Sequence, residues 1–200
     1  MRRLASRGCA LTGIDISREF LDAAAEAAGG QGLTVSLSCA DMRDLPAGSD
    51  FDAAFCFGNS FGYLDDRGNA DFLGAVAAAL APGARFAIDF GQTAEGVFPS
   101  FEPHLDVELG GIRFEEETRY DARTSRIENV FRINRGEESE TKLASQRVYL
   151  AGDLVRMLES AGFSVHALFG SPAEEPFALR SQRLLIVAEK TRASGGAKRD

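Results

Sequence analysis

Short apolar runs alternate with helical patterns between Cys9 and Phe90, and this order constrains the fold more than any other feature. Phe51 to Phe57 is almost wholly apolar, as expected of a parallel strand covered on both faces. Before it, Ser17 begins a helical pattern that Gly29-Gly30 ends. Alternation of strands and helices predicts an α/β fold with a mostly parallel sheet.

The pattern changes after Phe90. Three segments read as antiparallel strands of a β insertion over about residues 100–150: Val107–Tyr120, Arg126–Ile133 and Thr141–Leu150. A helical pattern then returns at Asp153, and two last strands, Phe163–Phe169 and Arg183–Glu189, are expected to form an antiparallel pair at the sheet edge. We therefore predict a single domain over residues 1–190 and a disordered tail over 191–200.

Composition excludes several functional classes. The net charge of −8 and the lack of a basic stripe argue against a nucleic-acid partner. No apolar stretch is long enough to cross a membrane, and no signal core follows the basic N-terminus. The chain has two histidines and no C-x-x-C motif, so no metal site is predicted. Its three cysteines are expected to be buried, reduced thiols of a cytoplasmic protein.

Candidate ligand-binding residues follow the strands, because ligands of such sheets bind at the carboxyl ends of the strands. Asp15 follows the first strand, and it either holds a ribose or caps the helix that begins near Ser17. Asp41 follows the second, and it either binds a ligand or, like Asp44, stabilises a turn. Taken together, Asp15 and Asp41 favour a clamp for a nucleoside, in which one carboxylate binds the ribose hydroxyls and the other an exocyclic amine.

Five motifs, in order, resemble those of class I S-adenosylmethionine-dependent methyltransferases. They are Gly13-Ile14-Asp15-Ile16-Ser17, Ala40-Asp41-Met42-Arg43-Asp44-Leu45, Phe51-Asp52-Ala53-Ala54-Phe55-Cys56-Phe57, Leu80-Ala81-Pro82-Gly83-Ala84-Arg85-Phe86 and Leu158-Glu159-Ser160-Ala161-Gly162-Phe163. The resemblance implies a Rossmann-like fold and S-adenosyl-L-methionine as cofactor. It also implies that Asp15 binds the ribose, that Ile16 packs on the adenine, and that Asp41 and Met42 hold the adenine edge. Phe57, Gly58 and Asn59 would line the methionine side.

The sequence departs from that family at its start. A glycine-rich turn is expected about 20 residues before the ribose-binding acid, and only 14 residues precede Asp15. We therefore expect the first strand and its turn to be absent, as in a truncated chain, which leaves open whether this chain is active. Unpaired strand edges in the sheet make an oligomer an open alternative.

Candidate acceptor contacts are Asn59, Tyr63 and Tyr120, because the family places its acceptor-facing loop after the third strand and the insertion is expected to form a wall over a small acceptor. His104 is interpreted as structural. The run Glu115-Glu116-Glu117 is interpreted mainly as a solvated strand face, with a site for a cationic substrate as the alternative. No catalytic residue is assigned, since methyl transfer requires alignment of the nucleophile more than a general base.

The predicted function is S-adenosylmethionine-dependent methyl transfer to a nitrogen or oxygen of a small molecule. A nicotinamide-dependent dehydrogenase is disfavoured because Tyr63 is followed at the fourth position by Arg67 and not by lysine. A non-catalytic interaction module on a degenerate methyltransferase fold is the alternative, and it predicts that the chain does not bind the cofactor.

Overall fold

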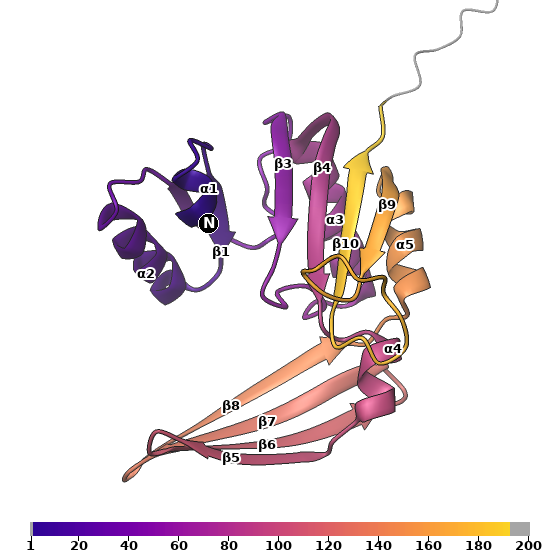
Figure 1. The fold of residues 1–200 in the computed structure, drawn as a ribbon. Coiled ribbons are helices and arrows are strands. Elements are labelled where there is room, and N and C mark those ends of the chain that lie inside the picture. Colours follow the sequence, from indigo (N-terminus) through magenta and orange to yellow (C-terminus); the bar gives the residue numbers. More distant parts are fainter. Residues whose placement is uncertain (1, 193–200) are drawn as a thin grey trace, which may run out of the picture. The chain divides into compact units, whose positions relative to one another are not determined.

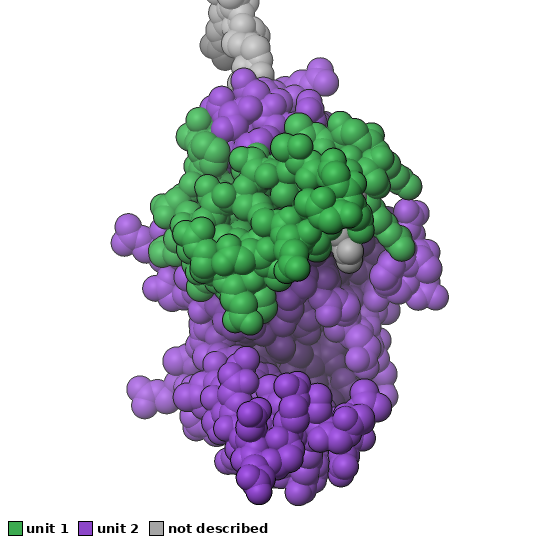
Figure 2. Space-filling view, turned by 90° about the vertical axis from the view of Figure 1, so that its left-hand side faces the viewer, with its two compact units in different colours: residues 1–47 green, residues 48–200 purple. Residues whose placement is uncertain are grey.

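The computed structural model describes residues 2–192 (Figure 1). The chain divides into two compact units, residues 1–47 and residues 48–200, which are coloured green and purple in Figure 2. The predicted tail at 191–200 lies, from residue 193 on, outside the described residues. Each unit has its own sheet or sheets, so each is described by itself.

The first unit is a small βαβ arrangement. Its elements are α1 (Arg2–Ala5), β1 (Thr12–Asp15), α2 (Arg18–Gly29) and β2 (Ser36–Cys39). β1 and β2 pair in parallel with Asp15 opposite Cys39. Ser17 caps α2, since its side chain accepts a hydrogen bond from the Phe20 N–H, and this confirms the predicted start of the helix.

The second unit contains a four-stranded sheet in the order β3-β4-β10-β9 (Figure 1). Its strands are β3 (Phe51–Cys56), β4 (Leu80–Phe90), β9 (Phe163–Phe169) and β10 (Leu184–Lys190). β3 is parallel to β4, whereas β10 is antiparallel to both β4 and β9. The mixed α/β sheet and the antiparallel pair at its edge are thus as the sequence predicts.

Helices α3 (Asp66–Ala79) and α5 (Ala151–Ser160) contact each other and cover one face of this sheet. Alternate residues of β4 point to that face, so that Phe86 and Ile88 are buried while Arg85 is exposed. Phe61, from the loop after β3, is completely buried and its ring contacts those of Phe72, Phe90 and Tyr149. Burial of each such aromatic ring contributes roughly 1.5–3 kcal/mol to stability, which fixes this loop on the core.

The insertion is an antiparallel sheet of four strands in sequence order (Figure 1). They are β5 (His104–Leu109), β6 (Ile112–Asp121), β7 (Arg126–Arg135) and β8 (Glu138–Arg147). The single strand predicted over 107–120 is wrong, because Gly110 and Gly111 adopt φ of +61° and +76° and turn the chain back on itself. Two consecutive left-handed residues are the geometry of a tight hairpin turn.

Two short helices connect β4 to the insertion, and the sequence patterns did not predict them. They are α4 (Ala94–Val97) and the 3-10 helix η1 (Phe98–Ser100). They matter for the site because β4 ends immediately before them. No helix within residues 2–192 is long and apolar enough to cross a membrane.

The expected burial of all three cysteines is wrong for two of them. Cys9 and Cys39 are exposed, and only Cys56 is buried. Burial raises the pKa of the Cys56 thiol to about 12, so this thiol stays protonated and unreactive near neutral pH.

Candidate functional site

Asp15 ends β1 with part of its carboxylate free. Its Oδ1 accepts a hydrogen bond of 2.8 Å from the Ser17 N–H at the start of α2. Its Oδ2 has no hydrogen-bond partner among the residues that the structure describes. One oxygen therefore supports the helix start, while ribose binding by the other stays a prediction.

Asp41 follows β2 and is paired with Arg43. Its Oδ1 accepts hydrogen bonds from the Arg43 backbone N–H and Nε, and its Oδ2 accepts one from Nη2, all at 2.8 to 2.9 Å. The side-chain hydrogen bond from Arg43 lowers the pKa of this carboxyl to about 2. Asp41 thus forms the turn that the sequence allowed, and a ligand amine would share this carboxylate with Arg43. Because β1 and β2 are paired in parallel, Asp15 and Asp41 follow the carboxyl ends of neighbouring strands.

Apolar surface lies beside Asp15 on the same unit. Ile16 is 76% exposed and Phe20 is 67% exposed within the described chain. These two apolar side chains are thus accessible beside Asp15. Met42, which follows Asp41, is partly buried.

In the second unit, the loop after β3 carries the other residues predicted to bind the cofactor. Phe57 is half exposed, with its ring centroid 5.3 Å from that of Phe55. Gly58 has φ of +79° with open space where a Cβ would be. Tyr63, a predicted acceptor contact, is also half exposed, and its carbonyl accepts a hydrogen bond from Arg126.

Asn59 uses its side chain for contacts within the protein. Its Oδ1 accepts a hydrogen bond from the Gly91 N–H, and its Nδ2 donates one to Gln146 Oε1, both of 2.9 Å. Gln146, on β8, is buried and donates in turn to the carbonyls of Asn59 and Phe61. The structure therefore brings Asn59 into a hydrogen-bond network with residues that the sequence analysis did not single out.

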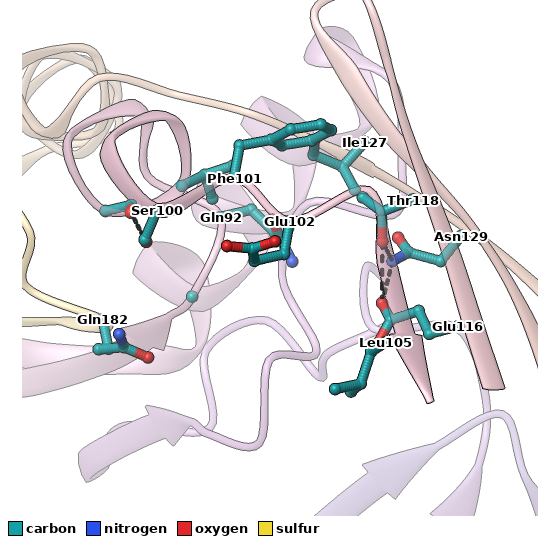
Figure 3. A pocket seen from close by; sticks show the side chains of 13 residues that line it. Gln92, Ser100, Phe101, Glu102, Leu105, Glu116, Thr118, Ile127, Asn129 and Gln182 are labelled. Atoms are coloured by element: carbon teal, nitrogen blue, oxygen red, sulfur yellow. Dashed lines mark hydrogen bonds between the residues drawn. The ribbon is translucent and has the colours of Figure 1, made fainter. Parts of the chain in front are cut away.

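A cavity of about 380 Å³ opens where β4 ends, between the connecting helices and the insertion (Figure 3). It lies at the carboxyl end of a strand, where ligands of α/β sheets bind. The lining residues are Gly91, Gln92, Gly96, Val97, Ser100, Phe101, Glu102, Leu105, Glu116, Thr118, Ile127, Asn129 and Gln182. Among them are two carboxylates and no lysine or arginine.

One of these carboxylates, that of Glu116, is held by its neighbours (Figure 3). Asn129 Nδ2 donates hydrogen bonds to Glu116 Oε1 and, at 3.0 Å, to Thr118 Oγ1. The Thr118 hydroxyl donates to Glu116 Oε1 at 3.2 Å. Glu116 Oε2 has no such partner in the described part of the chain. The arrangement presents one oriented carboxylate oxygen to the cavity.

The other cavity carboxylate, Glu102, has no hydrogen-bond or ion-pair partner among residues 2–192. It is exposed and follows η1 in the chain. Gln92 and Asn129 add amide groups to the lining. The cavity can therefore accept several hydrogen bonds from a small ligand, and a positively charged group suits it best.

The run Glu115-Glu116-Glu117 is divided between the two faces of the insertion sheet, because consecutive strand residues point to opposite sides. Glu115 and Glu117 are on the charged face, where they pair with Arg113 and Arg132. Glu116 is on the other face with Leu105, its partner in β5. The interpretation as a solvated face thus holds for two of the three residues.

Tyr120 and His104 lie outside the cavity lining. The Tyr120 ring packs edge-on against Phe98 with centroids 4.8 Å apart. His104 begins β5 opposite Glu117 on the charged face. The sequence analysis missed Gln92, Glu102 and Asn129. The position of Gln92 just after β4 was a usable signal, whereas the insertion residues required the strand register.

Comparison with known proteins gives a family match. Residues 1–83 match the family model described as a methyltransferase domain. Among curated proteins, none matches this sequence.

Several solved structures with this fold are described as methyltransferases. An S-adenosylmethionine-dependent methyltransferase from Clostridium acetobutylicum ATCC 824 is 17% identical with a TM-score of 0.83, over 92% of this chain and 76% of that one. The CcbJ methyltransferase from Streptomyces caelestis is 18% identical with a TM-score of 0.83, over 94% and 78%. CalS10 from Micromonospora echinaspora, an amino pentose methyltransferase with S-adenosylmethionine bound, is 18% identical with a TM-score of 0.65, over 91% and 74%.

Proposed function

We propose that this chain is a class I S-adenosylmethionine-dependent methyltransferase that methylates a small-molecule amine. The methyltransferase-domain match of residues 1–83 and the fold shared with solved methyltransferases support this proposal. The cavity at the end of β4 is proposed as the acceptor site. The observation that carries the proposal is the pair of carboxylates, Glu102 and Glu116, in a lining that contains no basic residue. An oxygen nucleophile of a small molecule is the second candidate, because the amide and hydroxyl groups of the same lining also suit hydroxyl ligands.

An amine is favoured over a hydroxyl by charge. A protonated amine entering the cavity gains from both carboxylates, whereas an alcohol gains only hydrogen bonds. CalS10, one of the proteins with this fold, is described as acting on an amino pentose. We propose that Glu116, oriented by Asn129 and Thr118, binds the acceptor amine or the group next to it.

The amine must lose a proton before it attacks, because only the neutral form has a lone pair. Glu102, which lacks a partner in the described chain and faces solvent, is proposed to accept that proton. S-adenosylmethionine supplies a methyl group made electrophilic by its sulfonium. The chain's own task is then to align the nitrogen with that methyl and to exclude water.

For the cofactor, we propose that the free Asp15 oxygen binds the ribose and that Ile16 packs on the adenine. Asp41 and Met42 are proposed at the adenine edge, with Asp41 shared between the adenine amine and Arg43. The assignments of Phe57, Gly58 and Asn59 to the methionine side, and of Asn59, Tyr63 and Tyr120 to the acceptor, stay predictions.

Matched pairs of acceptors test the proposal. The chain is incubated with S-adenosylmethionine and either an amine or its hydroxyl counterpart, for example a methyl amino-deoxyglycoside and the corresponding methyl glycoside. Formation of S-adenosylhomocysteine is measured. We expect turnover with amines and at most a tenth of it with the alcohols. Turnover confined to the alcohols would overturn the choice of nitrogen, and no turnover with either class would overturn the proposed activity on small molecules.

A further inference from the structure

The side chain of Gln146 joins the insertion to the loop after β3. Its Nε2 donates hydrogen bonds to the Asn59 carbonyl at 2.9 Å and to the Phe61 carbonyl at 3.1 Å. Its Oε1 accepts one from Asn59 Nδ2. Gln146 is only 5% exposed, so these three bonds replace water at every polar position of its amide.

Asn59 extends this connection to the end of β4. Its Oδ1 accepts the Gly91 N–H at 2.9 Å, so the amide of Asn59 bridges Gln146 and Gly91. Gly91 and the following Gln92 line the cavity. Three segments that are far apart in sequence, namely β8, the loop after β3 and the end of β4, are therefore fixed to one another by two side-chain amides.

We propose that Asn59 and Gln146 are positioning residues for the acceptor cavity. They hold the wall formed by Gly91 and Gln92 at a fixed place relative to the insertion, whose strands supply the opposite wall. This inference rests on the proposed function of the cavity, but the network itself does not depend on which acceptor is bound. In this proposal Asn59 acts on the cavity indirectly, through its hydrogen bond with the Gly91 N–H.

The residue types fit this task. An amide at position 146 can donate to two carbonyls and accept from Asn59 at once. A carboxylate there has no hydrogen to donate, so its oxygens would lie against the two carbonyl oxygens without a hydrogen bond. Asn59 has φ of +62°, a left-handed conformation in which asparagine is the side chain most often tolerated after glycine. Loss of either amide leaves buried carbonyl or N–H groups without partners.

The variants are chosen to separate the side chain from the backbone. Asn59→Gly keeps the left-handed backbone and removes the amide, whereas Gln146→Met keeps the length and volume and removes the polar group. Gln146→Glu keeps the acceptor and loses the donors. Asn69→Ala is the control, since Asn69 is completely buried and bridges the Leu64 carbonyl and the Tyr149 hydroxyl, with no hydrogen bond to Asn59, Gln146 or Gly91 in the described chain.

The first readout is hydrogen exchange of the Gly91 amide, which needs no acceptor. We expect Asn59→Gly and both Gln146 variants to speed this exchange at least tenfold relative to the amides of β10, and Asn69→Ala to leave that ratio unchanged. If the ratio stays the same in all variants, the network does not hold the cavity wall and the inference is overturned, whatever the enzyme methylates.

The second readout is kinetic and uses the amine of the matched pairs that gives the highest turnover. We expect KM for this amine to rise at least tenfold in Gln146→Met and Asn59→Gly, while the Kd for S-adenosylhomocysteine changes less than about twofold in Gln146→Met, whose site lies outside the predicted cofactor contacts. In the double variant, the rise should not exceed the larger single effect, because both changes break one connection. An equal rise of KM in the Asn69→Ala control would contradict a positioning role. So would a rise of KM in the double variant equal to the product of the two single effects.

Discussion

Asn129, on β7, donates a hydrogen bond to the carboxylate of Glu116, on the neighbouring strand β6. This contact, with that from Thr118, fixes the direction of a carboxylate that faces the cavity. The adjacent Glu117 points the other way and pairs with Arg132. Two neighbouring acids of one strand thus have different environments, and this difference can be tested.

Replacing Glu116 with Gln should lower kcat/KM for the amine substrate at least tenfold, because the oriented negative charge is lost while the shape of the side chain is kept. The matched control is Glu117→Gln, which removes a charge from the exposed face and should change kcat/KM less than twofold. Steady-state kinetics of both variants with one amine check this. A similar loss in the two variants would show that the charge of the strand, and not the cavity position, is responsible.

Asp15→Asn should weaken binding of S-adenosylhomocysteine at least tenfold. The amide oxygen still accepts the Ser17 N–H, so the helix start is kept, but the charged acceptor for the ribose hydroxyls is gone. Asp22→Asn, on the exposed surface of α2, is the control and should leave the affinity unchanged. Calorimetric titration measures both; an unaltered affinity in Asp15→Asn would remove the ribose assignment.

The Asp41 carboxyl should titrate near pH 2 in the intact chain, because Arg43 lowers its pKa from 3.8 to about 2. Because the pKa of Asp41 is lower in the folded state than in the unfolded state, ionised Asp41 stabilises the folded state at any pH above its unfolded-state pKa. This stabilisation is lost as the pH falls through the folded-state pKa. Arg43→Gln should return the titration midpoint toward 3.8. Carboxyl chemical shifts followed by NMR against pH provide the measurement, and an unchanged midpoint in Arg43→Gln would refute the pairing.

Alanine substitution at two glycines with open space around them should change the free energy of unfolding in opposite directions. Gly111→Ala should destabilise the protein by about 1 kcal/mol, because φ of +76° is unfavourable for a residue with a Cβ. Gly74→Ala, in helix α3, should stabilise it by about 0.5–1 kcal/mol through helix propensity. The free energy of unfolding from urea denaturation distinguishes them, and the same sign for both would contradict the hairpin geometry.

Much of the fold was predictable because each core strand carries a local signal. The apolar run Phe51 to Cys56 correctly marks a strand, and the cap at Ser17 marks a helix start within one residue. The expectation that this strand is covered on both faces is wrong, because β3 lies at the edge of its sheet and only Cys56 in it is buried. The hairpin at Gly110-Gly111 was missed, although two adjacent glycines are a known turn signal, because the apolar alternation continues on both sides of it.

The site was less predictable than the fold, because it depends on register and on contacts between distant segments. The position of Asp15 after a strand is visible in the sequence. By contrast, the pairing of Asn59 with Gln146 links residues 87 positions apart, and no local pattern identifies it. Glu116 becomes distinct from Glu115 and Glu117 only when the strand's two faces are assigned.

The most direct test of this account is the transfer of a deuterated methyl group from S-adenosylmethionine to the amine of a matched acceptor pair by the intact chain. The product is isolated, and fragmentation in a mass spectrometer locates the label. The account predicts that the label is on the amine nitrogen and that Glu116→Gln reduces its yield at least tenfold. A label found on an oxygen, or no labelled product from any amine, would contradict it.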